Sequence, residues 1–78
     1  MNGELRYYNA DYAVFLMRLK EARKASGLRQ TEVAERMGRA QSWVSKIEAG
    51  ELRVDFIELV YLARLYGQSL SYFEPPAH

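Results

Sequence analysis

The chain has 78 residues, which is enough for one small domain with a modest core, and it contains no cysteine. Disulfides and thiolate metal sites are therefore excluded, and this cysteine usage fits a cytoplasmic protein. The N-terminal segment lacks the apolar run of a signal peptide, and no stretch reaches the roughly 20 apolar residues that a membrane helix needs. The composition predicts a small globular protein with no cofactor and no membrane partner.

Positive charge is concentrated in the middle of the chain, although the net charge of the whole is only +1. Residues 18–53 contain nine Lys or Arg and five Asp or Glu, a net charge of +4, whereas both flanks are negative. A local basic surface matters more for contact with phosphates than the total charge does. A solvated surface of mixed charge is an equally good interpretation of these residues alone.

Five segments in chain order combine a helical spacing of apolar residues with suitable ends: 11–26, 30–37, 41–49, 55–66 and 69–73. Asp11 and Asp55 are good N-cap residues, and Asp55 with Glu58 also matches an acidic form of the capping box. A glycine follows each of the first four segments, as is common at helix C-termini. No segment alternates with a period of two, so we expect no sheet.

The predicted fold class is therefore all-α, with a compact five-helix domain. Its candidate core consists of apolar residues that recur on one side of each segment: Phe15, Leu19, Ala22, Val33, Ala34, Met37, Val44, Ile47, Phe56, Leu59, Leu62, Ala63, Tyr66, Leu70 and Phe73. The predicted organisation is an N-terminal leader (1–10), a domain (11–74) and a C-terminal tail (75–78).

Two of the segments, 30–37 and 41–49, are too short to be stable as isolated helices, and a tight turn that contains Gly38 joins them. Both must therefore pack against the longer helices. Two short packed helices joined by such a turn form a helix-turn-helix.

The second short helix presents a small polar face. On a helical wheel, Val44, Ile47 and Glu48 point inward. The outward residues are Gln41, Ser42, Ser45 and Lys46. In a major groove, Gln can pair with adenine, Lys can donate to guanine, and Ser permits close approach. These four residues are candidates for contact with DNA bases, although this helix taken by itself favours an ordinary solvated face.

Three motifs, GLRQTEVAERMG, QSWVSKIEAG and LARLYGQSL, occur in this order between Leu19 and Phe73. This stretch resembles, end to end and without a gap, the lambda-repressor and Cro-like helix-turn-helix family, also called the XRE family. The resemblance implies a transcriptional regulator that binds double-stranded DNA and places its second short helix in the major groove.

The resemblance also implies roles for residues around the two short helices. Gln30 would contact a phosphate at a helix N-terminus and brace Gln41. Further phosphate contacts would come from Arg29, Arg39, Trp43 and Arg53. Arg23 and Glu48 stand where the family often places a partly buried ion pair, and a solvated Glu48 at the rim is the alternative.

The chain also departs from the family pattern. Arg29 and Ala40 occupy positions that Ser or Thr caps usually hold, and the loss of such a cap costs about 1 kcal/mol. Val54 stands where proline is common, and we expect no counterpart of the second domain that the lambda repressors themselves carry. The tyrosine-rich leader has no counterpart that the resemblance explains.

A further apolar stripe runs along the outer side of the fourth segment. It consists of Ile57, Tyr61 and Leu65, with Tyr72 nearby. We interpret the stripe as a homodimer face, because other residues already supply the core. Surplus core, or a stripe covered by the leader, are the alternatives. A two-fold dimer would place two recognition helices in successive major grooves of a palindromic operator.

We expect no enzyme activity and no metal site. The only histidine, His78, is interpreted as a solvated terminal residue, and neither Ser42 nor Ser45 has a histidine within reach. The predicted function is that of a sequence-specific DNA-binding regulator. Two alternatives remain: an antitoxin that binds a toxin protein and regulates its own operator, and a protein-interaction module that does not bind DNA.

Overall fold

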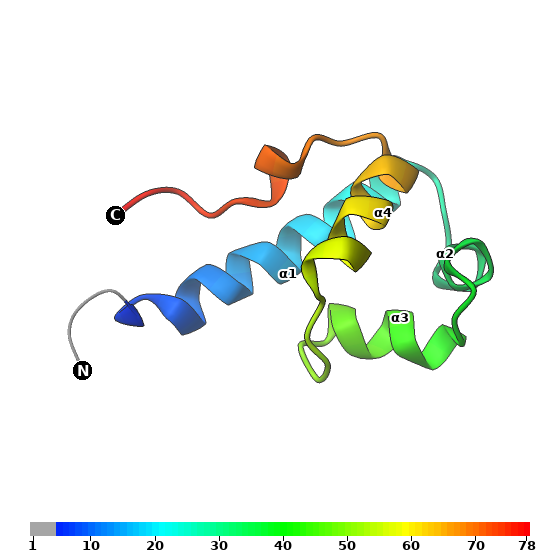
Figure 1. Cartoon of the computed structure of the whole chain (residues 1–78), viewed down its shortest axis with the longest axis horizontal. Coiled ribbons are helices and arrows are strands. Elements are labelled where there is room, and N and C mark those ends of the chain that lie inside the picture. Colours follow the sequence, from blue (N-terminus) through cyan, green and yellow to red (C-terminus); the bar gives the residue numbers. More distant parts are fainter. Residues whose placement is uncertain (1–4) are drawn as a thin grey trace.

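The computed structural model describes residues 5–78, and this part of the chain forms four α-helices and a short C-terminal 3-10 helix without a strand (Figure 1). The elements are α1 (Tyr8–Ala25), α2 (Gln30–Met37), α3 (Gln41–Glu48), α4 (Phe56–Tyr66) and η2 (Leu70–Phe73). The prediction of an all-α fold is confirmed, but only four of the five expected helices are α-helices. The fifth is a 3-10 turn, which ends where Glu74 becomes extended before Pro75. No helix within 5–78 is long and apolar enough to cross a membrane.

Helix α1 begins earlier than the sequence predicts. Asp11 is not its N-cap, because the Asp11 backbone N–H already donates to the Tyr7 carbonyl at 2.8 Å inside the first turn. A carboxylate in the first turn is still favourable, since it faces the positive end of the helix dipole. The terminal His78 is exposed, as expected, but it also contacts the start of α1. Its ring stacks on Tyr7 with centroids 3.9 Å apart, and its Nε2 lies 2.7 Å from Asp11 Oδ1.

The start of α2 shows how the chain manages without a Ser or Thr cap. Arg29 has no acceptor to offer, but the Glu32 carboxylate accepts the Arg29 backbone N–H at 2.8 Å, which supplies half of a capping box. This hydrogen bond lowers the pKa of Glu32. Helix α2 ends at Gly38, whose φ of 66° is accessible to glycine without strain. The tight turn into α3 follows directly.

Helix α4 has the complete capping box that the sequence predicts. Asp55 Oδ1 accepts the Glu58 backbone N–H at 2.7 Å, and Glu58 Oε1 accepts the Asp55 backbone N–H at 3.0 Å. The second Glu58 oxygen, Oε2, accepts a hydrogen bond from Arg39 in the α2–α3 turn. One carboxylate therefore both caps α4 and ties it to the helix-turn-helix.

The core is made by residues from every element: Leu19, Ala22, Val33, Ala34, Trp43, Val44, Ile47, Leu62, Ala63, Tyr66 and Phe73. Two residues expected in it lie outside. Phe56 is 65% exposed and Leu70 is 38% exposed. Helix α4 is apolar on several sides, so its periodicity alone does not identify the inward face, and Leu62 and Tyr66 take the buried positions. Trp43 is buried, with 9% exposure.

Helix α1 is the longest helix described, and it contacts α3, α4 and η2. It runs diagonally, with α2 and α3 on one side and η2 and the C-terminal segment returning along the other (Figure 1). Arg18 fastens this return by donating from Nη1 to the Tyr72 carbonyl at 2.6 Å. The short helices α2 and α3 pack against each other and α3 packs on α1, which leaves the outer side of α3 open.

Candidate nucleic-acid interface

Helix α3 has two sharply different faces. Trp43, Val44, Ile47 and Glu48 are buried, and their burial fixes the rotation of the helix about its axis. The residues that precede each buried pair are exposed, namely Gln41, Ser42, Ser45 and Lys46. The four side chains that the sequence marked for base contact therefore share one surface. They carry an amide, two hydroxyls and an ammonium group, which can meet donors and acceptors on base edges.

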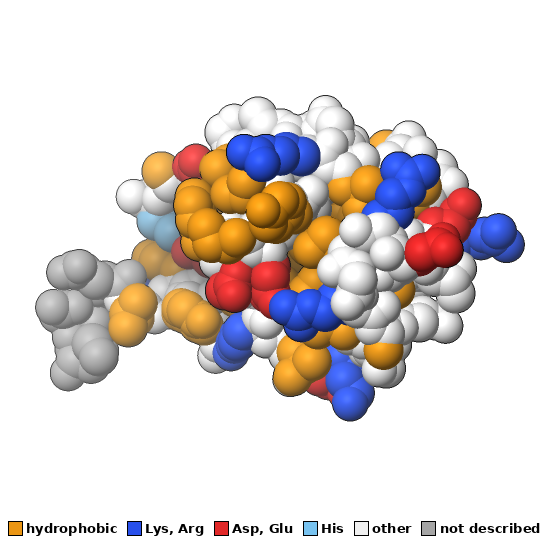
Figure 2. Space-filling model, turned by 45° about the vertical axis from the view of Figure 1, so that its right-hand side comes forward, with side chains coloured by type: hydrophobic (Ala, Val, Ile, Leu, Met, Phe, Trp, Pro, Cys, Tyr) orange, Lys and Arg blue, Asp and Glu red, His pale blue; other side chains and the backbone are white. Residues whose placement is uncertain are grey.

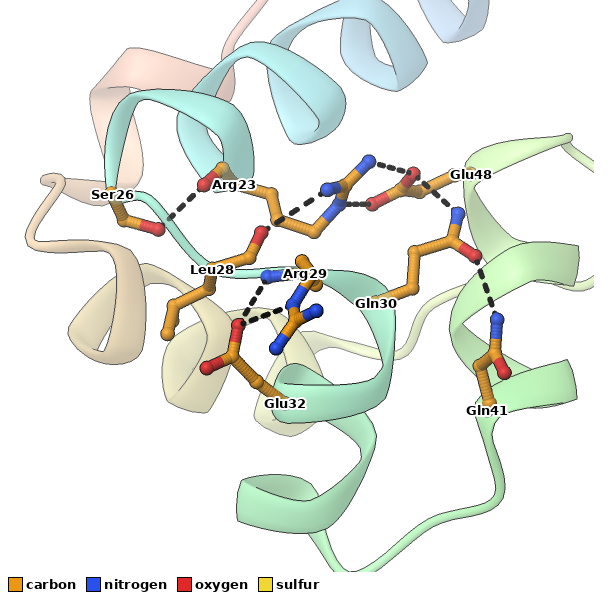
Figure 3. A network of polar contacts seen from close by, with 8 residues as sticks. All are labelled: Arg23, Ser26, Leu28, Arg29, Gln30, Glu32, Gln41 and Glu48. Atoms are coloured by element: carbon orange, nitrogen blue, oxygen red, sulfur yellow. Dashed lines mark hydrogen bonds and ion pairs between the residues drawn. The ribbon is translucent and has the colours of Figure 1, made fainter.

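A hydrogen-bonded network holds this face from behind (Figure 3). Arg23 on α1 donates from Nε and Nη2 to the two carboxylate oxygens of Glu48 on α3, at 2.6 and 3.0 Å. Gln30 at the start of α2 donates its amide to Glu48 Oε1 at 3.0 Å. Gln41 in turn donates to Gln30 Oε1 at 3.4 Å. The hydrogen bonds therefore connect α1 to Gln41, the first residue of α3.

The ion pair at the centre of this network is buried. The side chains of Arg23 and Glu48 are only 12% and 5% exposed, so Glu48 is not the solvated rim residue of the alternative interpretation. The Glu48 carboxylate raises the pKa of Arg23. Burial, followed by the charge of Glu48, also raises the pKa of neighbouring Tyr66. The buried Glu48 carboxylate accepts from three donors, which compensate for its loss of hydration. Removal of one donor would leave part of that desolvation cost uncompensated.

The residues expected to contact phosphates occupy different environments. Arg39 is exposed but already has partners within the chain, since its guanidinium carbon lies 4.7 Å from the Trp43 ring centroid and its guanidinium pairs with Glu58. Arg29 has an 83% exposed side chain and a loose 3.5 Å contact with Glu32. Gln30 is occupied by Glu48 and Gln41, so its bracing role is visible in the free protein.

Arg53 has the most distinctive surroundings of this group. It lies in the loop between α3 and α4, and its guanidinium carbon is 4.2 Å from the ring centroid of Tyr12 and 5.6 Å from that of Tyr8. Both tyrosines belong to the N-terminal turns of α1. Tyr8 at the end of the tyrosine-rich leader and the nearby Tyr12 therefore pack against the loop that follows α3.

The apolar stripe on α4 is only partly available. Ile57 and Tyr61 are 59% and 55% exposed, whereas Leu65 and Tyr72 are half-buried and pack against the core. Phe56 adds a third exposed apolar side chain at the start of the helix. On the face drawn in Figure 2, hydrophobic side chains gather in clusters beside charged ones. We call Phe56, Ile57 and Tyr61 the α4 patch; the described part of the leader does not cover it.

Sequence reasoning missed two parts of this arrangement. The sequence predicts Glu58 in a capping box and Arg39 at a phosphate, but it does not predict that the two side chains form an ion pair. The contact of Arg53 with Tyr8 and Tyr12 joins two segments distant in the chain. The i, i+4 spacing of the two tyrosines, which places them on one helix face, was the available signal.

Comparisons with known proteins agree with this geometry. Residues 15–71 match the family model described as a helix-turn-helix domain. The chain is similar to the solved structure of an XRE-family like protein from Pseudomonas syringae pv. tomato str. DC3000, with 41% sequence identity and a TM-score of 0.82. That similarity covers 94% of this chain and 89% of the other. No curated protein sequence matches the chain significantly.

Proposed function

The chain belongs to the XRE-like family of helix-turn-helix proteins and is a DNA-binding regulator, and from this premise we propose that it reads a palindromic operator as a homodimer. In this proposal α3 enters the major groove, and Gln41, Ser42, Ser45 and Lys46 meet base edges.

One observation carries the base-reading role: the exposed polar face of α3 is held in place by buried contacts. The four outward residues alternate with the buried pairs, and Gln41 is tethered through Gln30 to the buried Glu48. A base-reading side chain that is already ordered loses less conformational entropy when it binds. An ordinary solvated face has no need of such a tether.

Affinity in this proposal comes from contacts with phosphates. Arg29 and Arg53 are exposed beside the two short helices, whereas Gln30 is half-buried and Trp43 is buried in the core. Arg39 would contact a phosphate only by sharing its guanidinium with Glu58. Such contacts release counterions, so the binding constant should fall steeply as salt is raised.

The dimer part of the proposal rests on the α4 patch. Three large apolar side chains, each more than half exposed, lie within six residues of one helix. Exposed apolar patches on small proteins commonly mark contact with another protein. A second copy related by a two-fold axis would cover the patch with itself and set the two α3 helices about 34 Å apart.

Selection from a pool of random duplex DNA at about 150 mM salt tests both parts. We expect enrichment of a palindrome whose half-sites are about one helical turn apart. Enrichment of a single half-site would support base reading and contradict the dimer. Recovery of no preferred sequence, with only weak salt-sensitive binding, would contradict base reading and direct attention to a protein partner such as a toxin.

A further inference from the structure

We propose that Tyr12, assisted by Tyr8, is a positioning residue that holds Arg53 ready to contact a DNA phosphate. The proposal rests on the proposed DNA-binding function and extends the interface to residues that touch no DNA. Tyr8 and Tyr12 lie outside residues 15–71, the range that the helix-turn-helix model matches.

The geometry is that of a cation held over an aromatic platform. The Arg53 guanidinium carbon lies 4.2 Å from the Tyr12 ring centroid, well inside the range of about 6 Å for an attractive contact. Tyr8 extends the platform, since its ring is stacked 6.0 Å from that of Tyr12 at an interplanar angle of 23°. The two residues are one helical turn apart on α1, so the helix itself sets their separation.

The platform is anchored in the core. The ring of Tyr12 contacts Phe15 edge-to-face at a centroid distance of 5.3 Å, and Phe15 meets Phe73 in the same way at 6.4 Å. Phe73 is only 2% exposed. A continuous row of aromatic rings therefore runs from the buried core to the guanidinium of an exposed loop residue.

Within the described part of the chain, the hydrogen-bonding groups of the Arg53 guanidinium are not engaged. It makes no hydrogen bond or ion pair with any residue in 5–78, in contrast to Arg29, which contacts Glu32, and Arg39, which pairs with Glu58. Stacking engages the face of a guanidinium and leaves the N–H groups along its edge, which can bind a phosphate through two parallel hydrogen bonds.

The position of the loop agrees with this role. The loop that carries Arg53 follows the C-terminal end of α3 and lies on the same side of α1 as α3 (Figure 1). A long side chain in an unsupported loop must lose its rotamer freedom when it binds a phosphate. Contact with Tyr12 removes part of that freedom before DNA arrives, so the platform should strengthen binding without altering base preference.

The test is a double-mutant cycle with a fixed mixed-sequence DNA duplex as the probe. We expect Tyr12→Leu to weaken binding about three- to tenfold when Arg53 is present, and to have no further effect in the Arg53→Ala background. Tyr12→Phe is the matched control, because it keeps the ring and removes only a buried hydroxyl that has no partner among the described residues. It should bind as the wild type does.

A second measurement tests the contact between Arg53 and Tyr12 in the absence of DNA. In the free protein, ring currents should shift the side-chain NMR signals of Arg53 upfield, and Tyr12→Leu but not Tyr12→Phe should abolish the shift. If Tyr12→Leu unfolds, Tyr8→Leu, at a 44% exposed position, replaces it with a smaller expected effect.

Four outcomes would overturn the proposal. Unshifted Arg53 NMR signals would show that Arg53 does not stack on Tyr12 in the free protein. Equal weakening by Tyr12→Leu with and without Arg53 would reduce Tyr12 to a structural residue. A wild type that binds DNA while Arg53→Ala binds equally well, with an unchanged salt slope, would leave the DNA-binding function standing and remove Arg53 from it. A wild type that binds no duplex would overturn both.

Discussion

The outer face of α3 and the outer face of α4 are built on opposite plans. On α3 the exposed residues are polar, and the first of them, Gln41, is hydrogen-bonded through Gln30 to the buried Glu48. On α4 the exposed residues Phe56, Ile57 and Tyr61 are apolar, and more than half of each is open to solvent. The α3 face is already organised in one copy of the chain, whereas the α4 face gains most from being covered. The contrast predicts that base recognition by α3 and dimerisation through α4 can be removed by separate substitutions.

The largest expected effect comes from breaking the support of the α3 face. Arg23→Met leaves the buried Glu48 carboxylate without its cation, and we expect the free energy of unfolding to fall by about 3–5 kcal/mol. Urea denaturation measures this directly. The control is the double variant Arg23→Met with Glu48→Leu, which removes both charges and should recover most of the stability. A single variant as stable as the wild type would show that the pair is dispensable.

Substitution in the α4 patch should separate pairing from folding. Tyr61→Asp places a charge on the proposed two-fold interface, and we expect dimerisation to weaken by about 2 kcal/mol or more while helicity is kept. Sedimentation equilibrium and circular dichroism provide the two measurements. Met17→Asp changes a similarly exposed apolar residue on α1 and should leave the oligomeric state unchanged. A Tyr61→Asp protein that still dimerises would place the interface elsewhere.

Substitution on the α3 face should remove reading without affecting pairing. Gln41→Ala should weaken binding to the selected operator by about 1–3 kcal/mol and relax the preference at one base pair. Competition between the operator and its single-base variants measures this preference. Gln68→Ala, which removes an amide after α4, is the control and should change neither quantity. Equal loss of affinity on every sequence would argue against a base contact by Gln41.

The smallest effect concerns the start of α2, which positions Gln30. The Arg29 backbone N–H lowers the pKa of Glu32 below its ordinary value of 4.5. Because the folded pKa is the lower one, ionised Glu32 stabilises the fold above pH 4.5, and this contribution is lost as the pH falls through the folded value. Glu32→Gln should therefore lose less stability than the wild type on acidification below that value. Glu35→Gln, on the same helix, controls for net charge; identical acid profiles for the wild type and Glu32→Gln would contradict the prediction.

The sequence predicts local features of this molecule better than distant contacts. The bounds of α2 and α4 follow from Gly38, Asp55 and Glu58, which act within one helical turn. The inward position of Glu48 indicated that it needs a cation, and the resemblance to the helix-turn-helix family implied that Arg23 supplies it. The start of α1 was missed because Tyr7 gives no side-chain cap, so nothing in the local sequence marks the boundary.

The candidate site shows the same limit. The outward residues of α3 follow from helical periodicity, since Val44 and Ile47 define the inward side. On α4, apolar residues lie all around the helix, so periodicity does not separate exposed Phe56 from buried Leu62. The contact between Arg53 and Tyr12 depends on how a loop packs on α1, and tertiary packing rather than local propensity decides it.

The two oxygens of Glu58 have a consequence for how this sequence can diverge. Because Oε1 completes the capping box of α4 and Oε2 receives Arg39, a change at this position acts on two structures at once. Glutamine would keep an acceptor for the cap but lose the ion pair, and alanine would lose both. Substitutions at Arg39 and Asp55 should therefore show epistasis through Glu58, and relatives that lose the acid are expected to carry compensating changes in both the α2–α3 turn and the first turn of α4.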